Sequence, residues 1–174
     1  MKKGIIIKAP ALFTEDEKSK IKEQFQSKDI ETTFFSDDHI QASFDSLFQI
    51  LLNNEFVKGL IIGVGVDILK DIISKIVSKM KKKKVMIIDG DQDTKPAKLT
   101  IKSQTSKGTI YLEIPTDISD FALQESIEKI STAKNILDNN KKDGINDLYI
   151  IEDKFGNLSI MTLIEFINYK KNNQ

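Results

Sequence analysis

The longest periodic apolar run in the chain spans Phe56–Lys84 and combines three glycines with an amphipathic pattern and four consecutive lysines. From Ile62 onward its apolar residues recur every three or four positions, which is the spacing of one helix face. These residues are Ile62, Val66, Leu69, Ile73, Ile76, Val77 and Met80. The block Gly59–Val66 is apolar on all sides, and in a helix such a block is buried on every side. The run therefore predicts a central core helix that begins near Glu55.

The glycines in this run suggest a close contact with another backbone. A glycine inside a helix costs about 1 kcal/mol relative to alanine, so three together need a reason. Gly59 and Gly63 are one turn apart, and small residues at this spacing let a second backbone approach. One hypothesis is that the segment contacts a neighbour in its own core, and another is that it contacts a second copy or a protein partner. The candidate interface residues are Gly59, Ile62, Gly63, Val66 and Leu69.

A membrane is an alternative partner for the same run. Only Gly59–Val66 is without charge between Lys58 and Asp67, far short of the roughly 18 residues that a membrane span requires. An amphipathic helix followed by lysines is one form of membrane-surface helix. However, Asp67 and Asp71 lie on the polar face, where they would meet anionic lipid. Peripheral membrane binding through residues 56–84 is therefore an alternative to the core helix, which we favour.

Composition excludes several function classes. Acidic and basic residues number 26 each, so the chain has no net charge to attract nucleic acid. Every basic residue is lysine, and without guanidinium groups we expect no sequence-specific nucleic-acid partner. The absence of cysteine excludes disulfides and thiolate chemistry. The abundance of lysine, isoleucine and asparagine is typical of a bacterial genome rich in AT, and the short apolar run Ile5–Ile7 is not a signal peptide, so we predict a cytoplasmic bacterial protein.

The remaining patterns divide the chain into helices and strands. The expected strands are Gly4–Lys8, Ile30–Phe35, Val85–Ile88, Leu99–Gln104, Thr109–Ile114, Leu148–Glu152 and Leu158–Met161. The expected helices are 14–28, Gln41–Asn53, the central helix, 117–137 and a short helix after Thr162. Two of them begin with capping boxes, formed by Thr14 with Glu17 and by Thr162 with Glu165.

The order of these elements predicts an α+β fold. Residues 85–114 are expected to form an antiparallel meander packed with amphipathic helices, preceded by an N-terminal strand–helix–strand unit. The polar loop Asn139–Gly144 is the best candidate boundary. We therefore expect a main domain over residues 1–138 and a hairpin–helix element over 145–174 that packs on the same domain.

One acidic cluster is a candidate metal site. Asp89, Asp91 and Asp93 alternate after an expected strand, and carboxylate oxygens bind hard cations such as Mg²⁺ and Ca²⁺. The cluster is not an EF-hand loop, because Thr94 stands where glycine is required and Thr100 where glutamate is required. It supports an alternative function as a divalent-cation-dependent enzyme.

The scarcity of catalytic residue types favours binding over catalysis. No nucleophile elbow, P-loop or zinc-protease motif occurs in the chain. We therefore expect a small non-enzymatic bacterial protein, a regulatory, immunity or accessory subunit that acts through protein–protein contacts or self-association and carries no cofactor.

Overall fold

A mixed sheet of seven strands organises the structure, a computed structural model that describes residues 1–35, 47–88, 94–140, 146–153 and 155–173. The strand order is β2-β1-β3-β6-β7-β8-β9. The strands of this sheet are β1 (Lys3–Lys8), β2 (Ile30–Phe34), β3 (Phe48–Leu52), β6 (Leu99–Gln104), β7 (Thr109–Ile114), β8 (Asp147–Glu152) and β9 (Leu158–Thr162). Two short strands, β4 (Met86–Ile88) and β5 (Thr94–Pro96), form a separate pair. The helices are α1 (Glu15–Gln26), α2 (Asn54–Ile61), α3 (Val66–Lys82), α4 (Asp120–Asn139) and α5 (Leu163–Asn172).

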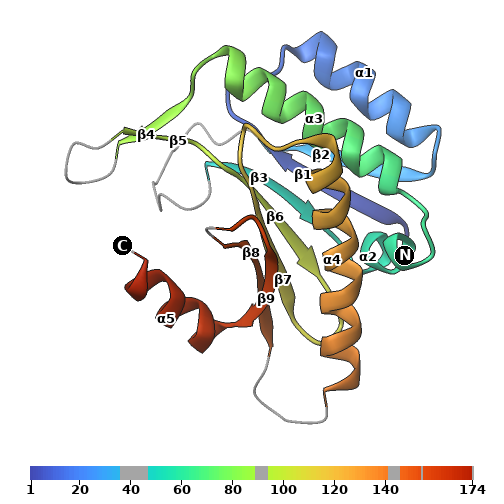
Figure 1. The fold of residues 1–174 in the computed structure, drawn as a ribbon. Coiled ribbons are helices and arrows are strands. Elements are labelled where there is room, and N and C mark those ends of the chain that lie inside the picture. The colour runs from blue at the N-terminus through green and yellow to red at the C-terminus, as the bar shows by residue number, and fades with distance from the viewer. Residues whose placement is uncertain (36–46, 89–93, 141–145, 154, 174) are drawn as a thin grey trace.

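The two faces of the sheet have different coverings. Helices α1 to α4 lie on one face, the inner face, while α5 lies on the opposite, outer face (Figure 1). Because side chains alternate along a strand, every second residue enters the inner core. The inner row across the middle of the sheet is fully buried and consists of Ile7, Ile50, Ile101, Leu112 and Ile150.

The N-terminal strand–helix–strand unit is confirmed. Strands β1 and β2 pair in parallel, and α1 connects them. Helix α1 begins with the expected capping box, in which the Glu17 amide donates to the Thr14 hydroxyl and the Thr14 amide donates to the Glu17 carboxylate. The second capping box, of Thr162 with Glu165, is also present at the start of α5.

The prediction of a helix over Gln41–Asn53 is wrong in its described part, because Phe48–Leu52 forms strand β3. The apolar spacing in this segment also fits a helix, but β3 lies in the middle of the sheet between β1 and β6. Four of the five residues of β3 are buried and only Leu51 is half-buried. Such a strand gives a nearly continuous apolar run, which periodicity cannot distinguish from a buried helix. Asn53 then caps α2, and its side chain also accepts from the Gly4 amide at 3.0 Å.

The prediction of a single central helix is also wrong, because a turn divides this segment into α2 and α3. Gly63 and Gly65 have φ values of +77° and +92°, a left-handed conformation that glycine adopts without the steric cost of a side chain. Ile62 is 77% exposed in this turn, so the block Gly59–Val66 is not buried on all sides. The apolar face of α3 is buried in the core, and a membrane could contact it only if the helix left that core. The residues of this face are Ile68, Leu69, Ile72, Ile73, Ile76, Val77 and Met80.

The α+β class is confirmed, but the expected three-stranded meander is only partly correct. Strands β6 and β7 form the predicted antiparallel hairpin. The first strand of the expected meander, Val85–Ile88, instead corresponds to β4, which pairs with β5 outside the main sheet. The main sheet is mixed because β6 pairs in parallel with β3, and β8 pairs in parallel with β7. Among the described residues, no helix is both long and apolar enough to cross a membrane.

Candidate functional site on the outer face of the sheet

A single row of side chains crosses the outer face from one edge strand to the other. The strand registers place its members directly opposite one another, although they come from seven different strands. In order from β2 to β9, the row is Thr33, Ile6, Leu51, Lys102, Tyr111, Tyr149 and Met161. Six spacings of about 4.8 Å make the row roughly 29 Å long. Apart from Lys102, its central members are apolar or aromatic.

The β1–β3 end of the row contains a hollow of about 230 Å³. Ile6 and Leu51 are among its apolar lining residues, and Ile6 is 41% exposed. Its polar lining residues include Glu31, Thr33 and Gln104. A hollow lined by both apolar and polar side chains can anchor one apolar side chain of a partner and bond to polar groups beside it.

A stack of three aromatic rings lies at the β7–β8 end of the row. The rings of Tyr111 and Tyr149 are 4.9 Å apart and nearly parallel, and Phe166 of α5 stacks on Tyr149 at 4.4 Å. Because Tyr149 lies between the other two rings, neither of its faces is open to a nucleic-acid base. The stack therefore differs from the exposed aromatics with which RNA-binding sheets hold bases. Its role in this structure is to fix α5 on the outer face.

The hydroxyl groups of the stack are in a poorly solvated, acidic environment. Partial burial raises the pKa of Tyr111, and the nearby Asp147 carboxylate raises it further. Burial likewise raises the pKa of Tyr149, with contributions from Tyr111 and Asp147. Both shifts favour the neutral phenol, so the stack stays uncharged over the neutral pH range.

Lys102 connects the hollow to the stack. Its ammonium group lies 5.7 Å from the centre of the Tyr111 ring, and its strand neighbour on the other side is Leu51. Within the described part of the chain, Lys102 forms no ion pair with a carboxylate, whereas Lys98 and Lys170 both lie within 4.0 Å of Glu113. Lys102 is a half-buried residue, and an ammonium group that forms no ion pair within the described ranges is well placed to receive a carboxylate from another molecule.

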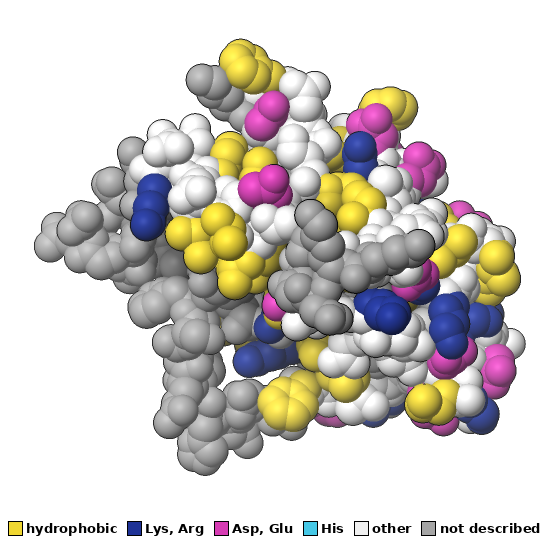
Figure 2. Space-filling view, turned by 90° about the horizontal axis from the view of Figure 1, so that it is seen from below, with side chains coloured by type: hydrophobic (Ala, Val, Ile, Leu, Met, Phe, Trp, Pro, Cys, Tyr) yellow, Lys and Arg dark blue, Asp and Glu magenta, His cyan; other side chains and the backbone are white. Residues whose placement is uncertain are grey.

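Helix α5 adds an exposed apolar side to this face. Phe166 points to the sheet, while Leu163, Ile164 and Ile167 follow around one side of the helix and stay exposed. Ile164 is 72% exposed. Figure 2, seen from below, shows hydrophobic side chains in several separate patches on the surface, with charged side chains between them. Exposed apolar groups in this density are typical of interaction surfaces.

The structure separates the five interface residues that the sequence suggested. Ile62 and Gly63 are exposed in the turn between α2 and α3, and Val66 is half-buried. Leu69 is fully buried in the core. Gly59 is buried as well, where an added Cβ would lie 3.1 Å from the Val64 carbonyl oxygen of the same chain. The close approach of Gly59 is therefore internal, and a contact through Ile62 and Gly63 stays a prediction.

The candidate metal residues Asp89, Asp91 and Asp93 lie outside the described residues. Strand β4 ends before them at Ile88, and β5 begins after them at Thr94. Within the described ranges, no group of three or more histidine, aspartate or glutamate side chains is placed to hold a metal ion. The cation hypothesis is thus neither supported nor contradicted.

Sequence reasoning missed most of the outer row. Tyr149 and Phe166 are far from Tyr111 and Lys102 in the sequence. The alternation of Asp147, Tyr149 and Ile151 was a usable signal, since it places them on the face opposite Leu148 and Ile150. Comparisons with protein-family models, curated proteins and solved structures find no match, so function must be inferred from the geometry alone.

Proposed function

We propose that this protein is a non-enzymatic binding subunit whose outer sheet face holds an amphipathic, acidic helix of a protein partner. The observation that carries the proposal is the continuous row that joins a hollow lined in part by Ile6 and Leu51, an ammonium group that forms no ion pair among the described residues, and an aromatic stack. The first two parts each match a feature of such a helix. The apolar side chains enter the hollow, and a carboxylate contacts Lys102.

The dimensions of the row fit a short helix. From the hollow at β1–β3 to Lys102 on β6 is about one strand spacing, roughly 5 Å, and one helical turn rises about 5.4 Å. An apolar residue in the hollow and an acidic residue one turn away would therefore meet their sites together. Helix α5 provides a precedent within the chain, because it already packs on this face through Phe166.

Designed peptides test the charge requirement directly. Two labelled peptides of about 14 residues, or four turns, would share one leucine stripe and differ in flanking residues, glutamate in one and lysine in the other. Fluorescence anisotropy then measures their affinity for the full chain. We expect the glutamate peptide to bind and the lysine peptide to bind at least tenfold more weakly, a difference of about 1.4 kcal/mol.

Matched variants locate the binding surface. Ile6→Glu places a charge in the hollow and Lys102→Glu reverses the central charge, and each should weaken binding of the glutamate peptide by tenfold or more. Ile62→Glu is the control, because Ile62 is an equally apolar and even more exposed residue in the α2–α3 turn. If Ile62→Glu abolishes binding while Ile6→Glu has no effect, the outer-face proposal is wrong and the turn is the interface.

A further inference from the structure

The free edge of β2 has the features of a contact between two copies of the chain. Strand β2 ends the sheet, and no described strand pairs with its second side. Edge strands are commonly protected from pairing by lysine, proline or a bulge. The sequence of β2, Ile-Glu-Thr-Thr-Phe, contains neither lysine nor proline, and its register with β1 is regular. The edge is therefore competent to pair with another strand.

The backbone groups that face this edge belong to alternate residues. The Phe35 amide donates to the Ile7 carbonyl oxygen of β1 at 2.9 Å. Because hydrogen-bonding direction alternates along a strand, Glu31 and Thr33 also face β1, whereas Ile30, Thr32 and Phe34 direct their amides and carbonyls outward. Thr32 is the middle residue of the strand. Its hydroxyl oxygen is buried and has no hydrogen-bond partner within the described structure.

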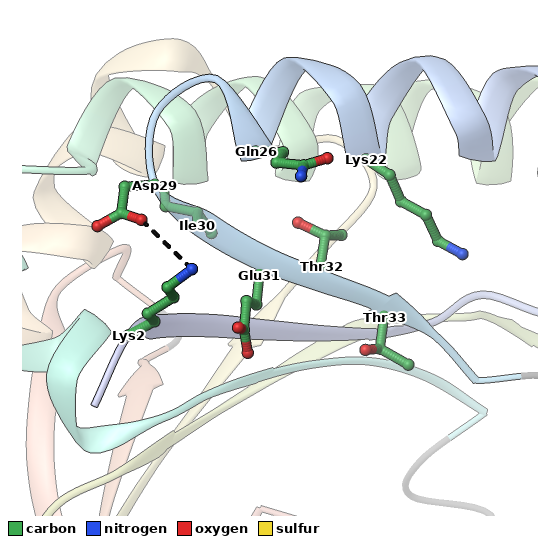
Figure 3. A pocket seen from close by; sticks show the side chains of 8 residues that line it. All are labelled: Lys2, Lys22, Gln26, Asp29, Ile30, Glu31, Thr32 and Thr33. Atoms are coloured by element: carbon green, nitrogen blue, oxygen red, sulfur yellow. Dashed lines mark ion pairs between the residues drawn. The ribbon is translucent and has the colours of Figure 1, made fainter.

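A hollow of about 370 Å³ runs along this edge between α1 and β2. In Figure 3, Thr32 and Ile30 point to the α1 side, and Glu31 and Thr33 point to the other side. The charges are separated along the edge. Asp29, which Lys2 approaches at 4.0 Å, lies at the Ile30 end, and Lys22 reaches out at the Thr33 end (Figure 3).

We propose that two copies of the chain pair antiparallel through β2, with the two-fold axis at Thr32. This register places Thr32 directly opposite the partner's Thr32, so the backbone amide and carbonyl of each bond to those of the other. Ile30 lies opposite the partner's Phe34, so the outward groups form about six backbone hydrogen bonds. Glu31 faces the partner's Thr33, which avoids a like-charge pair. The two-fold symmetry also brings Lys22 of each copy to the end of the partner's β2 where Asp29 lies.

A single cysteine at the two-fold axis gives the sharpest test, because the natural chain has no cysteine. Directly opposed residues in a hydrogen-bonded pair have Cα atoms about 5.5 Å apart, inside the roughly 4.4–6.8 Å range of disulfides. The Thr32→Cys variant should therefore form a cross-linked dimer on mild oxidation. Thr33→Cys is the matched control, since the two Thr33 Cα atoms would be about 8 Å apart, too far for a disulfide.

The unmodified chain provides an independent measurement by light scattering from about 1 μM to 1 mM. We expect a mass that rises from 19.7 kDa toward twice that value. Lys22→Glu should raise the dissociation constant of the dimer at least fivefold, because the new carboxylate would face the partner's Asp29. Adding Asp29→Asn should reverse part of this increase. Lys20→Glu, the same charge change on the opposite side of α1, should have no effect. A chain that stays monomeric throughout, or Thr32→Cys and Thr33→Cys variants that cross-link equally, would overturn the proposal.

Discussion

Replacing Phe166 by alanine tests whether the aromatic stack holds α5 on the outer face. The substitution removes the ring that stacks on Tyr149 at 4.4 Å, and leaves the capping box of α5 intact. A half-buried phenylalanine covers roughly 100 Å² of apolar surface, which corresponds to about 2.5 kcal/mol. The stacking geometry adds about 0.5 to 1.5 kcal/mol. The free energy of undocking α5 should therefore fall by about 3 kcal/mol.

Amide hydrogen exchange measures this change locally. A decrease of about 3 kcal/mol raises the population of undocked α5 roughly a hundredfold, so its amides should exchange faster by up to that factor. Amides of β1, β3 and α3 belong to the core on the other face and should keep their rates. Phe166→Tyr should restore slow exchange, because it preserves the stacked ring.

Ile164→Ala is the matched control, since Ile164 is on the same helix and is largely exposed. It shortens an apolar side chain and leaves the stack untouched, so α5 should exchange at its normal rate. Equal acceleration in Ile164→Ala and Phe166→Ala, or no acceleration in either, would show that the stack does not hold the helix.

Three further changes should alter the stability of the fold. Asn53→Ala should lower the free energy of unfolding by about 2 kcal/mol in urea titrations, because the Asn53 side chain caps α2 and also bonds to Gly4 and Lys2. Asn53→Asp keeps the hydrogen-bond acceptor and should lower the free energy of unfolding by less. Gly65→Ala should lower the free energy of unfolding by about 1–2 kcal/mol or more, because φ is +92° and the added carbon would lie 3.1 Å from the Phe56 ring. Gly63→Ala should lower it by less, because the added carbon would have open space around it. The pKa values of Tyr111 and Tyr149 are raised in the folded chain, so the folded state favours the neutral phenols. The stability that these two tyrosines contribute is complete below the ordinary tyrosine pKa of about 10 and is lost above it. The urea midpoint should therefore fall as the pH increases above about 10. The double variant Tyr111→Phe with Tyr149→Phe should remove most of this alkaline dependence.

The sequence predicted local features better than distant ones. Both capping boxes were found because Thr14 and Glu17, like Thr162 and Glu165, are only three residues apart. The β6–β7 hairpin was found because its strands alternate and are joined by a short turn. These signals depend on neighbours in the sequence and need no knowledge of the rest of the fold.

Two errors have a common physical cause, which is that a continuous apolar run shows no clear period of its own. Four of the five residues of β3 are buried, and its apolar run also fits a helix. The residues around Gly63 are apolar, but Gly63 and Gly65 end one helix and begin another through their positive φ values. Apolar composition alone could not distinguish a buried helix from a turn with exposed isoleucines.

The candidate site could not be predicted because it depends on the strand order. Leu51, Lys102 and Tyr149 belong to β3, β6 and β8, and only the pairing of non-consecutive strands places them in one row. Alternation in each strand indicated which residues face outward. It did not indicate which strands are neighbours.

The aromatic stack also gives this molecule an unusual optical property. The chain has no tryptophan, and its three tyrosines are Tyr111, Tyr149 and Tyr169. Two of them form the stack, and the third is on α5. The intrinsic ultraviolet emission of the folded chain therefore comes from one end of the outer face. A peptide without tyrosine or tryptophan that covers this face would change the emission of an unlabelled, unmodified protein, whereas pairing through β2 at the far edge of the sheet would leave it unchanged.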